Sequence, residues 1–266
     1  MLVNHEVPEC LLGYSNEISN YDFCLPHLLD QSEKYRKYFY KAKKEGRYII
    51  MDNSLHELKD VNNGNGYDHK RLMYWVNELE PNEFIVPDVW MDIDATLKNA
   101  EEWIKITYPK NTTPVAVVQS RNFKDAEECY LALKKLGYKK IAFSYGADWY
   151  TDKFHGIHVD KAKMMGRISA VKQMFYNGVI KANDRIHLLG CSLPQEFGWY
   201  ENCSYIESID TSNPIMAALE GIEYDDFGLL TKPKANMNDY FNVDIKDVNL
   251  KLVLNNVETF KKINEL

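Results

Sequence analysis

Short apolar runs alternate with amphipathic stretches along most of this chain. The apolar runs end in polar loops, as buried strands do, and the stretches between them repeat apolar residues at helical spacing. Strands are predicted at 9–14, 48–52, 84–87, 114–119, 140–144, 186–190 and 205–210. Helices are predicted at 68–79, 94–107, 124–136, 161–178, 213–220 and 243–263, with Asp94 as the N-cap of the second. This alternation predicts a mostly parallel sheet with helices outside it.

The predicted strands favour an α/β fold, a (β/α)8 barrel of the TIM type, closed by an eighth strand near 228–231 or 241–244. A doubly wound open sheet is the alternative, but it would normally carry a glycine-rich first turn. No Gly-x-Gly-x-x-Gly or Walker motif occurs, and 63–67 is predicted as a turn. We expect a single domain over 1–266, with its core at about 9–245 and a C-terminal helix at about 243–263 packed on the barrel.

The composition is that of an ordinary soluble globular protein, with 45% hydrophobic and 27% charged residues in a chain of 266. No apolar run approaches the roughly 20 residues that a membrane-spanning helix needs. The first residues lack the basic and apolar regions of a signal peptide. We therefore expect a cytoplasmic protein with no membrane partner.

The cysteines and the net charge exclude some classes of protein. The five cysteines are odd in number and form no Cys-x-x-Cys pair, so reduced buried thiols are expected, with no metal site and no cofactor. A formal charge of −7 is unlike that of a protein that coats nucleic acid. It still leaves room for a local basic groove.

Three aspartates each stand at the C-terminal end of a predicted strand: Asp52, Asp88 and Asp210. One such residue is explained equally well as the cap of the following helix or turn. A series of them is typical of a parallel barrel, which builds its active site from the C-terminal ends of its strands. Carboxylates in this arrangement suit glycosidic chemistry.

The strand ends also contain an ordered set of short motifs: Met51-Asp-Asn-Ser54, Val86-Pro-Asp-Val89, Val117-Val-Gln-Ser120, Phe143-Ser-Tyr-Gly146, His187-Leu-Leu-Gly190 and Ser208-Ile-Asp210. In their order and spacing, from about residue 48 to 214, the chain resembles the tRNA-guanine transglycosylase superfamily. It is most similar to the DNA 7-deazaguanine transglycosylases of phages and bacterial modification clusters. That family is a (β/α)8 barrel that exchanges a guanine in a nucleic acid for a 7-deazaguanine.

The resemblance implies roles for individual residues. Asp210 matches the nucleophile that bonds to C1′ of the nucleotide, and Asp52 matches the general acid/base. Both roles are carboxylate chemistry, as in retaining glycosidases. The base-binding set implied by the resemblance is Asp88, Gln119, His56, Ser144, Tyr145, Gly146, Leu189 and Gly190.

The chain departs from the family pattern at several positions. Ser54 and Leu55 replace two glycines, His56 replaces an aromatic residue that stacks on the base, and Ser144-Tyr145-Gly146 replaces a Gly-Gly-Leu turn. The family's zinc site would follow the nucleophile, but no cysteine follows Cys203, so the zinc subdomain is expected to be absent.

Because that subdomain helps tRNA docking in the family, we expect DNA as the macromolecular substrate, with tRNA second. A 7-deazaguanine such as 7-cyano-7-deazaguanine is the expected small-molecule substrate, and a protein partner would supply the basic surface that a chain of charge −7 lacks. A retaining glycoside hydrolase or nucleosidase with the same carboxylates is the alternative enzyme. A barrel that binds nucleic acid or a deazapurine without catalysis is the third possibility.

Overall fold

A computed structural model describes residues 1–59 and 66–266 of the chain. Eight parallel strands form one sheet in the order β1-β8-β7-β6-β5-β4-β3-β2, and helices alternate with them. From β2 to β8 this order places each strand beside its neighbour in sequence, and it places β1 beside β8, so the fold is the predicted (β/α)8 TIM type. Positions 63–65 of the predicted turn lie outside the described residues.

The chain divides into two compact units, one made of 1–20 with 144–266 and the other of 21–143. The first unit contains β1 (Leu2–Asn4), β7 (Arg185–Leu189) and β8 (Ile206–Asp210). The second contains β2 (Asp22–Cys24), β3 (Ile49–Met51), β4 (Glu83–Ile85), β5 (Thr113–Val118) and β6 (Lys140–Ser144), except that Ser144 belongs to the first. The single domain over 1–266 stays a prediction.

Six of the predicted strands correspond to β3 through β8, but the prediction was wrong at both ends of the chain. Residues Glu9–Tyr14 form a 3-10 helix, η1, in which the N–H of Leu11 bonds to the carbonyl of Pro8. Neither 228–231 nor 241–244 is a strand; the former contains only the end of an isolated bridge between Asp225 and Gly228. The remaining strands are β1 and β2, each only three residues long, which is too short to show a sequence period.

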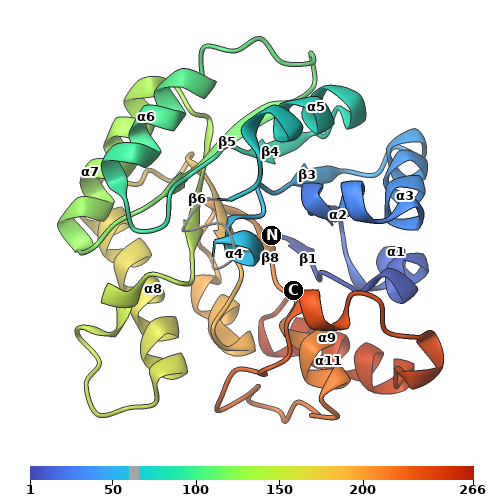
Figure 1. The fold of residues 1–266 in the computed structure, drawn as a ribbon. Helices are drawn as coiled ribbons and strands as arrows, with labels where there is room; N and C mark the ends of the chain where they lie inside the picture. Colours follow the sequence, from blue (N-terminus) through green and yellow to red (C-terminus); the bar gives the residue numbers. More distant parts are fainter. Residues whose placement is uncertain (60–65) are drawn as a thin grey trace. The chain divides into compact units, whose positions relative to one another are not determined.

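The first unit packs its C-terminal helix against its own last barrel helix. Its further helices are α1 (Ser15–Ile18), η2 (Asp148–Thr151), α8 (Val159–Tyr176), η3 (Pro194–Tyr200), α9 (Asn213–Leu219), α10 (Met237–Tyr240), η4 (Ile245–Asp247) and α11 (Leu250–Ile263). α11 lies beside α9 (Figure 1) and buries Val253, Val257 and Phe260. The buried amide of Asn256 adds polar contacts, since it accepts from the N–H of Tyr224 and donates to the carbonyl of Ile222. This helix begins later than predicted.

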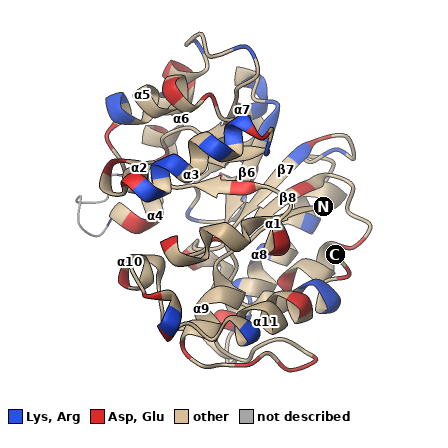
Figure 2. Cartoon of the chain, turned by 90° about the vertical axis from the view of Figure 1, so that its right-hand side faces the viewer, with Lys and Arg blue, Asp and Glu red and all other residues tan. Residues whose placement is uncertain are grey.

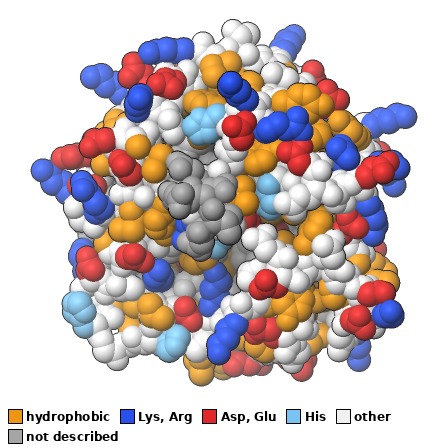
Figure 3. All heavy atoms as spheres, viewed as in Figure 1, with side chains coloured by type: hydrophobic (Ala, Val, Ile, Leu, Met, Phe, Trp, Pro, Cys, Tyr) orange, Lys and Arg blue, Asp and Glu red, His pale blue; other side chains and the backbone are white. Residues whose placement is uncertain are grey.

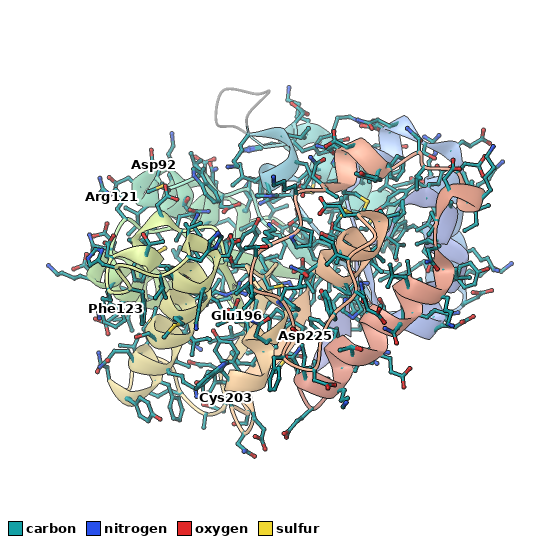
Figure 4. All side chains as sticks on the ribbon, turned by 90° about the horizontal axis from the view of Figure 1, so that it is seen from below. Asp92, Arg121, Phe123, Glu196, Cys203 and Asp225 are labelled. Carbon is teal, nitrogen blue, oxygen red and sulfur yellow. The ribbon has the colours of Figure 1, made fainter. Side chains whose placement is uncertain are left out.

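The second unit contains the helices α2 (Pro26–Gln31), α3 (Glu33–Lys44), α4 (Leu55–Leu58), α5 (His69–Leu79), α6 (Ile93–Trp103) and α7 (Phe123–Leu136). α6 and α7 lie side by side (Figure 1). Asp68, Asp92 and Asn122 cap α5, α6 and α7 through their side-chain oxygens. The N-cap of α6 is therefore Asp92, labelled in Figure 4, and the prediction of Asp94 was wrong by one half-turn.

The surface of the second unit includes a basic helix. Figure 2 shows several Lys and Arg positions along α3. Some of these residues have acidic neighbours on the same helix, as in the pair of Lys37 with Glu33 at 2.7 Å. Such exposed pairs contribute little stability and leave the helix solvated. Among the described residues, no helix combines the length and the apolar character that crossing a bilayer requires.

A buried ion pair links two strands of the second unit, because Lys140 Nζ of β6 lies 2.6 Å from Glu83 Oε2 of β4 and both side chains are 1% exposed. We expect Lys140→Met to lower the free energy of unfolding by about 3–5 kcal/mol, since it removes the cation beside a buried carboxylate. Urea unfolding would measure this change. The exposed neighbour provides the control, because Lys139→Met should change stability by less than about 0.5 kcal/mol. Equal stability of the two variants would contradict the prediction.

Candidate functional site

The predicted site residues fall into two groups, one in each compact unit. Asp52, His56, Asp88 and Gln119 belong to the unit 21–143 and follow β3, β4 and β5. The other group closes or follows β6, β7 and β8 in the first unit and consists of Ser144, Tyr145, Gly146, Leu189, Gly190 and Asp210. Each group therefore stands at the C-terminal ends of its strands, as the sequence predicts.

Asp52 follows β3 directly and is buried, with 8% of its surface exposed. Its Oδ2 accepts the backbone N–H of Ser54 at 2.8 Å. Ser54 has a φ of 57°, in the left-handed region that favours glycine. The backbone thus keeps the conformation expected of a glycine although a serine is present, and a hydrogen bond of 2.8 Å between Ser54 Oγ and His27 Nδ1 helps to hold it.

Asp88 is the centre of a buried hydrogen-bond network in the second unit. Asn53 Nδ2 donates to Asp88 Oδ1 at 2.6 Å and to the carbonyl of Val86 at 2.9 Å. Gln119 Nε2 donates to Asp88 Oδ2 at 2.6 Å. Burial raises the pKa of Asp88 above its ordinary value, while the hydrogen bonds from Gln119 and Asn53 act in the opposite direction.

The orientation of the Gln119 amide is fixed from its other side. Gln119 Oε1 accepts the N–H of Met91 at 2.9 Å, so the amide nitrogen faces Asp88. Met91 has a φ of 55°, an unfavourable backbone conformation for a residue with a side chain. An amide NH₂ group has two donors, and the contact with Asp88 uses one of them. The described residues provide no hydrogen-bond acceptor for the other.

His56 lies in the short helix α4, and its side chain is exposed. The sequence assigns it to the base-binding set only through the resemblance. His56 follows Asp52 by four residues in the sequence. The stacking role stays a prediction.

In the first unit, Asp210 is the last residue of β8 and is 3% exposed. His187 Nε2 lies 3.0 Å from Asp210 Oδ1, and His187 Nδ1 lies 2.8 Å from Ser208 Oγ. The N–H of Gly190 adds weak contacts of 3.4 Å to both carboxylate oxygens. Asp210 is thus held by a fully buried histidine from the neighbouring strand β7.

Gly190 has to be a glycine for steric and conformational reasons. Its φ is 59°, and a Cβ atom there would lie 2.6 Å from the ring of Tyr145. Tyr145 in turn donates its N–H to the carbonyl of Leu189 at 3.1 Å, and its hydroxyl accepts a hydrogen bond from Lys232. Gly146 donates its N–H to Ser144 Oγ at 3.2 Å. These contacts bring the predicted residues of β6 and β7 together.

A buried arginine supports the same turn. Arg167 of α8 donates to the carbonyls of Leu189 at 2.8 Å and Gly190 at 2.6 Å, and its Nε lies 2.6 Å from Glu196 Oε1. Arg167 and Glu196 are both fully buried, and Glu196, labelled in Figure 4, belongs to η3. A guanidinium with its donors fixed in one plane suits such a clamp on two carbonyls. The clamp fixes the backbone that carries Gly190.

The sequence prediction missed the residues that hold the predicted ones: Asn53, Met91, His187, Ser208, Arg167 and Glu196. Asn53, His187 and Ser208 stand inside the motifs found at the strand ends, so their positions in the sequence could have marked them as site residues. Glu207, another carboxylate of β8, accepts a hydrogen bond from Arg185 at 2.6 Å. Comparison with protein-family models finds no matching family, and comparison with curated proteins finds no similar sequence.

Proposed function

We propose that this protein is a pentosyltransferase that exchanges a guanine base, in DNA rather than tRNA, for a 7-deazaguanine. Asp210 would form a covalent bond to C1′, Asp52 would act as general acid and base, and Asp88 with Gln119 would bind the base. The proposal rests on the sequence resemblance together with the contacts of these residues.

The observation that supports it best is the oriented pair of Asp88 and Gln119. Guanine presents two donors, N1–H and the exocyclic amine, next to one acceptor, O6. Asp88 accepts, and the second N–H of Gln119 donates, so the pair is complementary to this edge. Adenine presents an acceptor at N1 and a donor at N6, so it would leave buried groups of the site without partners. 7-Deazaguanines share the guanine edge.

The reaction would proceed by two displacements with net retention. Asp210 attacks C1′ as the C1′–N9 bond breaks, and the leaving guanine takes a proton from Asp52. The incoming base then loses its N9 proton to Asp52 and attacks C1′, which returns the electron pair to the Asp210 carboxylate. The proposal requires both carboxylates to reach one nucleotide.

The preference for DNA rests on the resemblance, since the motifs at the strand ends are most similar to those of the DNA 7-deazaguanine transglycosylases. A duplex substrate would need its nucleotide turned out of the stack, which costs a few kcal/mol. The face drawn in Figure 3 carries basic and acidic side chains interspersed, and the net charge is −7. We therefore propose a protein partner that supplies further basic surface.

The test is incubation of the purified protein with labelled guanine or 7-cyano-7-deazaguanine and with either DNA or tRNA. Incorporation into DNA supports the proposal, whereas incorporation into tRNA alone would move the substrate to tRNA. Release of free base without any incoming base would instead identify a nucleosidase. Nucleoside mass spectrometry of DNA from cells that express the protein gives an independent readout.

The network around Asp88 provides a prediction about pH. Asn53→Ala removes a hydrogen bond that lowers the pKa of Asp88, so this pKa rises further above its ordinary value. Because base binding needs the ionised carboxylate, the acid limb of kcat/KM for the base should move to higher pH, and KM at neutral pH should rise about 10-fold. Asn99→Ala in α6 is the matched control and should leave both unchanged. An unmoved acid limb in Asn53→Ala would count against the role of Asp88.

A further inference from the structure

The hydrogen-bond chain Ser208–His187–Asp210 fixes the position of the proposed nucleophile and also determines which nitrogen of His187 donates to it. His187 is 0% exposed and Asp210 is 3% exposed, so water does not compete for the bond between them. An ionised carboxylate only accepts, so Nε2 of His187 carries the proton in that bond. With Nε2 as the donor to Asp210, the other ring nitrogen, Nδ1, lies 2.8 Å from the Ser208 hydroxyl, which can donate to it.

The two oxygens of Asp210 are therefore not equivalent. Oδ1 is engaged by His187 at 3.0 Å, whereas the contact of Oδ2 that the described residues provide is the weak one with the Gly190 N–H at 3.4 Å. The oxygen that is held less tightly is the one that can bond to C1′. The other then becomes the carbonyl oxygen of the glycosyl ester.

We propose that His187 is a positioning residue that makes Asp210 a good leaving group in the second displacement; this inference rests on the proposed function. A hydrogen bond to an ionised carboxylate is stronger than one to an ester carbonyl. His187 thus stabilises the carboxylate that returns when the Oδ2–C1′ bond breaks and the N9–C1′ bond forms. Ser208 fixes the ring tautomer that supplies this donor, as a hydrogen bond to the other ring nitrogen does for histidines that bind metals.

The substitution that tests this is His187→Leu, with His187→Gln as its matched control. A glutamine amide retains a donor toward Oδ1 and an acceptor toward Ser208. In rapid-quench experiments, the covalent adduct is formed with the nucleic acid and then chased with 7-cyano-7-deazaguanine. We expect adduct breakdown to slow by about 10- to 100-fold in His187→Leu and by much less in His187→Gln, with KM for the base changed less than the rate.

Breakdown at the wild-type rate in His187→Leu, or an equal defect in both variants, would overturn the inference. Nitrogen NMR of the unmodified protein gives a second readout that needs no variant and no substrate. It should find a proton on Nε2 of His187, and an unprotonated Nε2 would also overturn the inference. A wild-type protein that forms no adduct would instead reject the proposed function, so the two failures are distinguishable.

Discussion

Asp210→Asn is expected to abolish base exchange, with a loss of about 10⁴-fold or more, the range seen when a residue of a covalent catalytic unit is removed. An amide oxygen does not form a stable glycosyl ester, so no covalent adduct should form with the nucleic acid. The asparagine keeps the size of the side chain and an acceptor for His187 and Gly190, so the fold should persist. Incorporation of labelled guanine and denaturing electrophoresis of the adduct measure the two effects.

The matched control is Glu207→Gln on the same strand. It removes one negative charge from β8 at a residue that is bound to Arg185 at 2.6 Å. Exchange should stay within a few-fold of the wild type. An adduct that persists in Asp210→Asn would remove Asp210 from the nucleophilic role.

Asp52→Asn is expected to slow exchange by about 10²- to 10⁴-fold, the usual contribution of a positioned general acid or base. The variant cannot protonate N9 of the departing guanine, so formation of the adduct becomes slow. The defect should shrink with a substrate whose base leaves more easily, since such a base needs less protonation. Single-turnover rates with the two leaving bases provide the measurement.

Asp68→Asn is the control for this charge change in the same unit. Asp68 caps α5 by accepting from the N–H of Arg71 at 2.9 Å, and asparagine caps helices about equally well. Exchange by this variant should match that of the wild type. A defect in Asp52→Asn that is the same for good and poor leaving bases would contradict general acid catalysis.

The barrel was predictable because its main signals are local. Apolar runs for six strands and the spacing of apolar residues in the helices are properties of neighbouring residues. The structure confirms those strands and the helices α5 to α9 within a few positions. The three-residue strands β1 and β2 carry no period, and their pairing with β8 and β3 is decided by residues far away in sequence. The strand predicted at Glu9–Tyr14 was wrong for a similar reason, since a short apolar run is compatible with more than one backbone conformation.

The carboxylates Asp52, Asp88 and Asp210 were also predictable, because parallel strands place their C-terminal residues at the functional end of a barrel. The contacts that hold these carboxylates were not predictable. Asn53 meets Asp88 across 35 positions, and Arg167 reaches the carbonyl of Gly190 across 23. Sequence alone determined β3 to β8, the helices α5 to α9 and the three acids that follow or close their strands. Tertiary packing decided which oxygen of each acid is held and by which donor, because buried polar groups must find partners and those partners come from other elements of the fold.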